Sequence, residues 1–433
     1  MSPMKRRTFL TGVAAAGAGT ALGWPKNVLA SQACSGVGRN VIIVFVGGGW
    51  DSTYSVDPKS PTALIEPPAG SIASAGNIDY FDATATQGTV KDFFDHHYDV
   101  TAVVKGIQVS SISHIGCTNK IFTGTASTKN ADFGALAARH HGACMPIPYL
   151  AIGPSAYSGP YGSYVGRMGQ IGQLRGLILP EERMPPIVGS PYENTEFQML
   201  ESDDLRVKDF LQGRAERLQA TRGQVGYNQK RLNDFIESVE RRYNLKDFQD
   251  SIPERDSGNV LAFPLMSQLQ LAEASIKEGL SFAAVVKADS SFDTHSNNGS
   301  QGPIQKSLFS DLDSFITQMK TPYSGSTCLL DHTTVVVMSE MTRTPKKNGG
   351  GGKDHWPVAC ALVIGAGVAG DQVYGATSDK MEGLAVNYQD GSEQGSDLQY
   401  VKTENFVAGL LDLLNAPIPD YLTGTPFSPY KAS

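Results

Sequence analysis

The chain has 433 residues, 40% of them hydrophobic and 18% charged, so it is long enough to bury a substantial core. Its 43 acidic and 36 basic residues give a formal net charge of −7. This balance argues against nucleic-acid binding, which requires a basic surface.

The first 30 residues have the pattern of a twin-arginine signal peptide. Lys5-Arg6-Arg7 precedes an apolar stretch rich in Ala and Gly, and Val28-Leu29-Ala30 offers small residues for cleavage. A membrane anchor is the alternative, although the stretch is short for a span of roughly 20 residues. We therefore expect the twin-arginine translocase to export residues 31–433 to the periplasm or the medium. No stable membrane span is expected after cleavage.

The remaining sequence alternates between expected strands and helices. The strands are apolar or rich in β-branched residues and cover 41–46, 100–109, 149–152, 281–287, 333–338 and 357–364. The helices have apolar residues at helical spacing and cover 115–123, 263–280, 303–319 and 403–415. This order predicts an α/β fold: one domain, 31–433, with a mostly parallel sheet covered by helices on both faces.

Two further stretches are read from their composition. Residues 54–90 are rich in Pro, Ser, Ala and Gly and are expected to be loop. Residues from about 194 to 250 are polar with helical spacing, which indicates a helical insert. The five cysteines lack the spacing of metal ligands, and Cys117 and Cys144 are candidates for a disulfide in an oxidising compartment.

Acidic and histidine side chains gather after the expected strands. Ligands of such sheets bind beyond the carboxyl ends of the strands. We expect metal ligands there, and the candidates are Asp51, Asp293, His295, Glu340, Asp354 and His355. Carboxylate and imidazole groups suit one or two divalent cations, zinc first, with manganese, magnesium or calcium as alternatives.

Each candidate also has an ordinary structural explanation. Asp51 could cap a turn or helix, and Glu340 could pair with Arg343.

Two cations about 4 Å apart would hold the attacking and leaving oxygens of an in-line displacement.

Ser113 is the candidate nucleophile, because it stands at the expected N-terminus of helix 115–123. A hydroxyl there, next to a cation, would be activated. A plain helix cap is the alternative, as is a Ser-His-Asp triad, although no G-x-S-x-G elbow surrounds Ser113. Arg343 or the glycine-rich loop after it would stabilise the developing anion.

Three other His-containing segments are not expected to belong to the site. Asp95-His96-His97 lies on a polar stretch, and Arg139-His140-His141 lies near a helix end, where a positive imidazole is favourable. Asp331-His332 precedes its strand and so lies at the opposite edge of the sheet.

Five motifs, in order, resemble those of the exported bacterial proteins known as domain-of-unknown-function family 1501, a branch of the alkaline phosphatase and sulfatase superfamily. Gly48-Gly49-Trp50-Asp51 resembles the family's G-G-x-D motif, and Ser113-His114 with Thr123-Gly124 resembles its S-H…T-G motif. Phe292-Asp293-Thr294-His295 resembles W-D-T-H. Ser339–Thr344 resembles S-E-F-G-R-T, and Asn348–His355 resembles N-G-G-G-x-D-H. The resemblance implies an alkaline-phosphatase-like fold.

The resemblance also implies roles for the candidates. Asp51 and Glu340 would serve one metal ion. Asp293, His295 and His355 would serve the other, with Ser113 near the place of the nucleophile. The chain departs from the superfamily at Met341, where a His is usual, and in the short spacing from Asp293 to His295. The Cys-x-Pro-x-Arg core is absent, so a formylglycine sulfatase is not expected.

The sequence thus predicts an exported metal-dependent hydrolase of a phosphate, sulfate or related ester, acting on a small molecule or a polysaccharide. The alternative is a non-catalytic exported protein that keeps the fold, binding polysaccharide or assisting envelope assembly. A metal-free serine esterase is a third reading.

Overall fold

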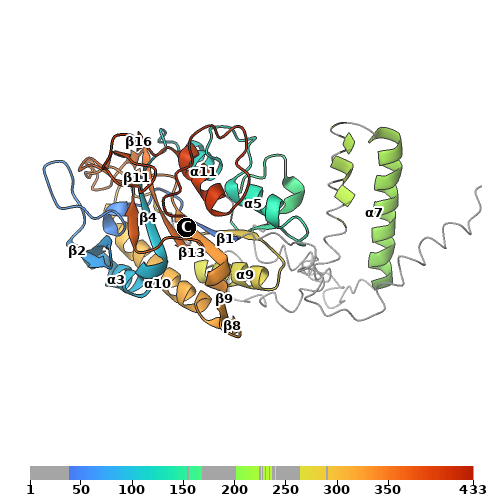
Figure 1. Cartoon of the computed structure of the whole chain (residues 1–433), viewed down its shortest axis with the longest axis horizontal. Coiled ribbons are helices and arrows are strands. Elements are labelled where there is room, and N and C mark those ends of the chain that lie inside the picture. Colours follow the sequence, from blue (N-terminus) through green and yellow to red (C-terminus); the bar gives the residue numbers. More distant parts are fainter. Residues whose placement is uncertain are drawn as a thin grey trace, which may run out of the picture.

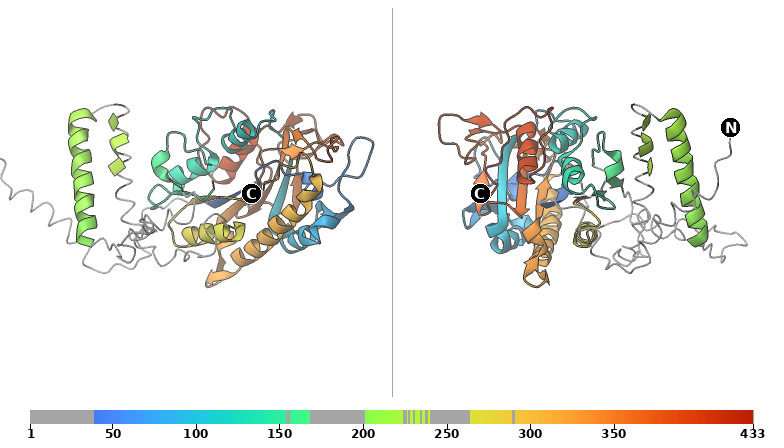
Figure 2. Two further views of the ribbon diagram at one scale, coloured as in Figure 1. Left: turned by 180° about the vertical axis from the view of Figure 1, so that it is seen from behind. Right: turned by 45° about the vertical axis from the view of Figure 1, so that its right-hand side comes forward.

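The computed structural model describes residues 39–153, 156–167, 201–223, 264–288 and 291–432, with scattered positions between 226 and 239. The expected signal peptide, 1–30, lies outside these residues, as do residues 194–200 and 240–250 of the expected insert, 194–250. Within the insert, α7 (Glu201–Arg222) is helical, as expected, and stands away from the sheet in Figures 1 and 2.

A central sheet of eight strands organises the described part of the chain (Figure 1). Across the sheet the strands are β14 (Gln372–Tyr374), β4 (Thr101–Gln108), β13 (Val358–Gly365), β10 (Thr333–Met338), β1 (Asn40–Phe45), β7 (Ala283–Lys287), β5 (Tyr149–Ala151) and β6 (Val165–Arg167). The pairs are parallel except those that β13 makes with β10 and β4. The predicted α/β class with a mostly parallel sheet is confirmed, and all six expected strands form.

Helices cover both faces of the sheet because the strands are apolar on both sides. In β1, Ile42 and Val44 belong to one hydrophobic cluster and Val41 and Ile43 to another, and all four are fully buried. The first cluster is covered by α3 (Thr89–His97), α9 (Leu265–Lys277) and α10 (Gln301–Met319). The second is covered by α4 (His114–Thr123), α5 (Phe133–His141) and α11 (Thr403–Leu413).

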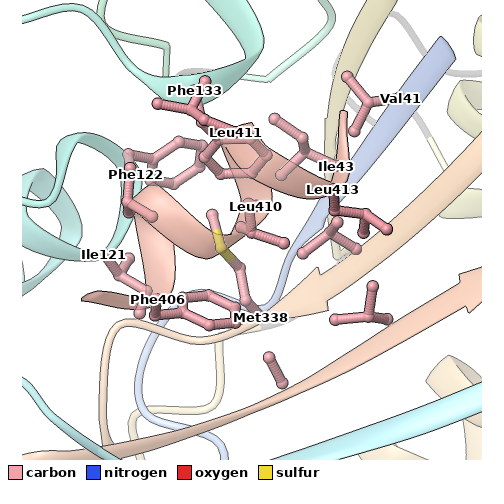
Figure 3. Packing of buried hydrophobic residues seen from close by; sticks show 14 of the residues in the cluster. Val41, Ile43, Ile121, Phe122, Phe133, Met338, Phe406, Leu410, Leu411 and Leu413 are labelled. Carbon is pink, nitrogen blue, oxygen red and sulfur yellow. The ribbon is translucent and has the colours of Figure 1, made fainter. Parts of the chain in front are cut away.

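The second cluster shows how closely these layers pack (Figure 3). Leu410 and Phe406 of α11 lie beside Met338 of β10, with Phe122 of α4 and Phe133 of α5 further along the same layer, and none of the five is exposed. Burying each such side chain contributes about 1.5–3 kcal/mol. The strand ends that carry the candidate site residues therefore extend from a rigid scaffold.

The prediction of a loop over residues 54–90 is wrong in part. β2 (Gly70–Ala75) and β3 (Ile78–Ala83) form an antiparallel hairpin. The two residues between them are Gly76-Asn77, and Gly76 has a φ of 55°, as tight hairpin turns require. A high content of small residues concealed this turn signal.

The proposed pairing of Cys117 with Cys144 is also wrong. Cys117, on the buried face of α4, is a free thiol, and Cys144 is disulfide-bonded. The side chain of Cys117 belongs to the second hydrophobic cluster, where it packs as a small apolar residue.

Short elements complete the described structure. The strands are β8 (Pro322–Ser324), β9 (Thr327–Cys328), β11 (Thr342–Arg343), β12 (His355–Trp356), β15 (Ala385–Val386) and β16 (Gln399–Tyr400). The 3-10 turns are η1 (Ser52–Tyr54), η2 (Thr84–Thr86), η3 (Tyr98–Val100), η4 (Gly162–Tyr164), η7 (Asn298–Ser300) and η8 (Leu329–His332). Among the helices described, none combines the length and the apolar character needed to cross a bilayer.

Candidate metal centre

Five chain segments meet at one edge of the sheet. The parallel strands β1, β4, β7 and β10 end there, and the antiparallel β13 begins there. The reversed direction of β13 brings Asp354 and His355, which precede it, to the same edge as His114 and Asp293, which follow β4 and β7.

Three histidine side chains surround the carboxylate of Asp293. The Nε2 atoms of His295 and His355 lie 3.0 Å and 3.4 Å from Asp293 Oδ1, and Nε2 of His114 lies 3.4 Å from Oδ2. Ligand atoms of His114, Asp293 and His355 are all within 4.8 Å of one another, and Nε2 of His295 lies 2.9 Å from that of His355. We call His114, Asp293, His295 and His355 the four-residue cluster.

The Nδ1 atom of each of these histidines is held by an acceptor. For His114 the acceptor is Glu340 Oε1 at 2.7 Å, and for His295 it is Asp354 Oδ1 at 2.9 Å. For His355 it is the carbonyl oxygen of Ile112 at 2.7 Å. Because carboxylate and carbonyl oxygens only accept, each Nδ1 carries the proton, and the Nε2 atom of each ring is the one that can offer a lone pair to a cation in the cluster.

Such an arrangement fits a cation. Two Nε2 lone pairs facing each other at 2.9 Å, in His295 and His355, repel unless a proton or a metal ion lies between or beside them. Nε2 of His114 is buried and lacks a hydrogen-bond partner in the described structure. Three imidazole nitrogens and one carboxylate are the donor set that zinc and similar ions prefer.

Neighbouring charges favour the ionised form of Asp293. Burial alone would raise its pKa, but Arg343, with smaller effects from His114 and His355, lowers the pKa to about 2. Nη2 of Arg343 donates to Asp293 Oδ1 at 2.7 Å. The hydrogen bond to Glu340 raises the pKa of His114, against a smaller opposing effect of burial.

Arg343 is fully buried and largely committed to the protein itself. Besides Asp293, it donates to the backbone oxygens of Gly48, Gly49 and Lys353. These bonds fix the glycine turn after β1 against the segment that carries Asp354. The geometry therefore makes Arg343 a residue that positions Asp293.

Glu340 and Asp354 face the cluster through histidines. Glu340 is buried, and its carboxylate also accepts from the backbone N–H of Gly48 at 2.8 Å and from the hydroxyl of Ser339 at 3.1 Å. Asp354 is exposed, and hydrogen bonding by His295 lowers its pKa. Of the six residues predicted as ligands, Asp293, His295 and His355 present ligand atoms to one another, and Glu340 and Asp354 orient imidazoles.

Asp51 has a different environment. Its buried carboxylate accepts from the hydroxyl of Thr53 at 2.6 Å, the amide of Asn298 at 2.8 Å and Nζ of Lys353 at 3.0 Å. Burial would raise its pKa, but Lys353 and these hydrogen bonds together lower it. No contact within the described residues joins this carboxylate to the four-residue cluster. Asp51 also caps η1, the alternative considered for it.

Ser113 is the N-cap residue of α4, directly before His114. Its side chain is exposed and makes no capping hydrogen bond, so the cap explanation does not account for the hydroxyl. In the glycine-rich loop, Gly352 packs tightly on His295: a Cβ at Gly352 would lie 2.0 Å from the carbonyl carbon of His295.

The three segments excluded from the site lie elsewhere. His96 and His97 end α3, near the start of β4, and their rings share Asp313 Oδ1 at 2.8 and 3.1 Å, which makes a second, separate group of possible ligands. Arg139-His140-His141 forms the last turn of α5, and His332 ends η8 just before β10.

Sequence reasoning missed two residues of this region. His114 is not among the predicted ligands, although its position after β4 matches that of the other candidates after their strands. Lys353 lies in a glycine-rich loop, and the sequence carries no sign that its ammonium group is buried.

The family described as "Protein of unknown function (DUF1501)" matches residues 188–390, which confirms the resemblance to it. A search of curated proteins gives no significant match.

Solved structures with a similar chain include hydrolases. One similar structure is Ps i-CgsB in complex with k-i-k-neocarrahexaose, which is 9% identical in sequence to this chain. The match covers 91% of this chain and 75% of that chain, with a TM-score of 0.39. The phosphonate monoester hydrolase of Agrobacterium radiobacter has 13% identity, coverages of 91% and 77%, and a TM-score of 0.33. Alkaline phosphatase from the Antarctic bacterium TAB5 has 11% identity, coverages of 78% and 94%, and a TM-score of 0.31.

Proposed function

We propose that this protein is an exported metal-dependent hydrolase of a phosphate, sulfate or related ester, with one cation held by the four-residue cluster. The observation that carries the proposal is the convergence of three Nε2 atoms on the Asp293 carboxylate, with every Nδ1 held by an acceptor. A ring orientation fixed in this way is typical of histidines that bind metal.

The four-residue cluster is accessible to a substrate. The side chains of Asp293 and His295 are 36% and 45% exposed, and that of His355 is 18% exposed. A bound divalent cation would polarise an ester oxygen and stabilise the charge that develops on it. The protein's residues would hold that cation, with Arg343 keeping the Asp293 carboxylate ionised and in place.

Ser113 is the proposed nucleophile. It lies next to His114 in sequence and its hydroxyl is exposed, with no capping bond to break before attack. At the N-terminus of α4, the helix dipole would favour the anionic ester formed by the attack.

Replacement of Ser113 tests this role. S113A should bind the metal as the wild type does and lose turnover of phosphate or sulfate esters by at least about 100-fold. S127A is the matched control, because Ser127 is an exposed serine just beyond the other end of α4. Full activity in S113A would exclude Ser113 as the nucleophile.

Metal dependence is tested with the same ester substrates. Purified protein should lose turnover on chelation and regain it with zinc or another divalent ion, and H295A should show neither activity nor recovery. Turnover that resists chelation would instead support a metal-free esterase.

A non-catalytic binding role is the second candidate, and the burial of Met341 favours it. Where the superfamily usually has a histidine, Met341 packs fully buried in the second hydrophobic cluster, so a second cation beside Asp51 would lack this ligand. Tight metal binding without turnover of any ester tested would favour this role.

Export rests on the sequence pattern around Arg6 and Arg7. We propose a periplasmic or secreted location reached through the twin-arginine translocase. Changing both arginines to lysine should leave the precursor in the cytoplasm, as measured by cell fractionation. Unchanged export of this variant would contradict the route.

A further inference from the structure

The Asp51 carboxylate already has a cationic partner supplied by the chain. Asp51 is 0% exposed, and its Oδ2 atom lies 3.0 Å from Nζ of Lys353. The same oxygen accepts from Asn298, while Oδ1 accepts from both the hydroxyl and the backbone N–H of Thr53. Both oxygens of the carboxylate are thus occupied.

Lys353 is equally enclosed. Its side chain is 1% exposed, and its Nζ atom has Thr53 Oγ1 at 3.5 Å as a second neighbour. Arg343 fixes the backbone of Lys353 by donating to its carbonyl oxygen at 3.1 Å. A lysine so deeply buried is stable as a cation only beside a counter-charge, and Asp51 supplies it.

The other residues expected at a second cation are committed as well. Glu340 accepts from His114, Gly48 and Ser339, and Met341 contributes a buried thioether to the hydrophobic cluster. A divalent ion beside Asp51 would also lie within a few ångströms of the Lys353 ammonium group, whose repulsion is strong in a water-poor interior.

We propose that the ammonium group of Lys353 takes the place, beside Asp51, of the second cation that the family resemblance implies. This edge of the sheet therefore binds one divalent cation, at the four-residue cluster. The count of one rests on the proposed function, whereas the pairing of Lys353 with Asp51 does not.

Metal stoichiometry tests the count. Full-length mature protein, saturated with zinc and freed of excess, should contain one ion per chain by elemental analysis. D51N should also contain one ion and D293N none. Two ions in the wild type and one in D51N would overturn the proposal.

Thermal unfolding tests the ion pair independently of metal. K353M should lower Tm clearly, because it leaves the Asp51 charge buried without a partner, and D51N/K353M should recover part of the loss. K347M is the matched control, since Lys347 lies in the same loop and pairs with Glu66 at the surface. Additive effects of D51N and K353M would overturn the proposal.

The two arms separate the possible failures. A wild type that binds no zinc would refute the proposed function, and the unfolding cycle would still decide the role of Lys353. One zinc ion with additive unfolding effects would refute the lysine and leave the metal centre standing.

Discussion

Glu340 shows how one buried carboxylate orients a neighbouring imidazole. It is fixed by Gly48 and Ser339, and it accepts from Nδ1 of His114. This hydrogen bond orients the ring so that the Nε2 atom of His114 lies 3.4 Å from Oδ2 of Asp293. Arg343, three residues after Glu340 in the same sequence motif, donates to Oδ1, the other oxygen of the Asp293 carboxylate.

E340Q should weaken metal binding. A glutamine oxygen still accepts from His114 but lacks the charge that makes the imidazole a strong ligand, so zinc affinity should fall about 10–100-fold. Competition with a chromogenic chelator measures it. E393Q, at an exposed position, should bind zinc as the wild type does. If E340Q binds equally well, Glu340 does not position His114.

The glycine-rich loop between β11 and β12 acts as one element that positions residues of the site. Asn348 donates to the backbone oxygen of His295 and to Asp354, and Gly352 lies against His295. The loop thus places Asp354 and His355 against the segment that follows β7.

Two glycines of this loop make a matched pair for substitution. In G352A the new Cβ would lie 2.0 Å from backbone atoms of His295, so the loop must move and separate His295 from His355. Zinc affinity and Tm should both fall. G349A, where no atom lies within 4 Å of the new Cβ, should change neither. Equal behaviour of the two variants would contradict the tight packing at Gly352.

The main elements could be predicted from the sequence because hydrophobic pattern decides them. β1 and β10 are continuous apolar runs, and the helices alternate with them. The direction of β13 could not be predicted, since a buried strand has the same pattern whether parallel or antiparallel. The hairpin of β2 and β3 could not be predicted because the residues of β2 are mostly small and exposed, although β3 has buried Ile78, Tyr80 and Phe81.

The candidate site could be predicted only in part. The positions of Asp293, His295 and His355 after or before a strand pointed to one edge of the sheet, and the structure brings them together. Distances between acceptors and Nδ1 atoms decide which acids orient an imidazole, as Glu340 does, and no sequence pattern encodes them. The partner of Asp51 depends on the burial of Lys353, which appears only in the folded chain.

The stability of the whole molecule should depend on the protonation of Asp132. This fully buried N-cap residue of α5 accepts from the backbone N–H groups of Ala135 and Tyr157 and from the Tyr149 hydroxyl. Burial, opposed by these bonds, raises its pKa to about 7. Between pH 4 and 7 the folded chain therefore retains a proton that the unfolded chain has released, and stability falls as pH rises through this range.

D132N removes this titration. The free energy of unfolding of the wild type should fall from pH 5 to pH 8 more than that of D132N, by an amount on the order of a few kcal/mol. Urea unfolding at the two pH values measures the difference. Parallel pH profiles for the two proteins would show that Asp132 is ionised throughout.

For the whole molecule, the central claim is that one cation binds at the edge of the sheet where β1, β4, β7 and β10 end. The most direct measurement is anomalous scattering at the zinc absorption edge from crystals grown with zinc. We predict a peak bonded to Nε2 of His114, His295 and His355 and to the Asp293 carboxylate. Crystals saturated with zinc that show no peak between these four side chains would contradict it.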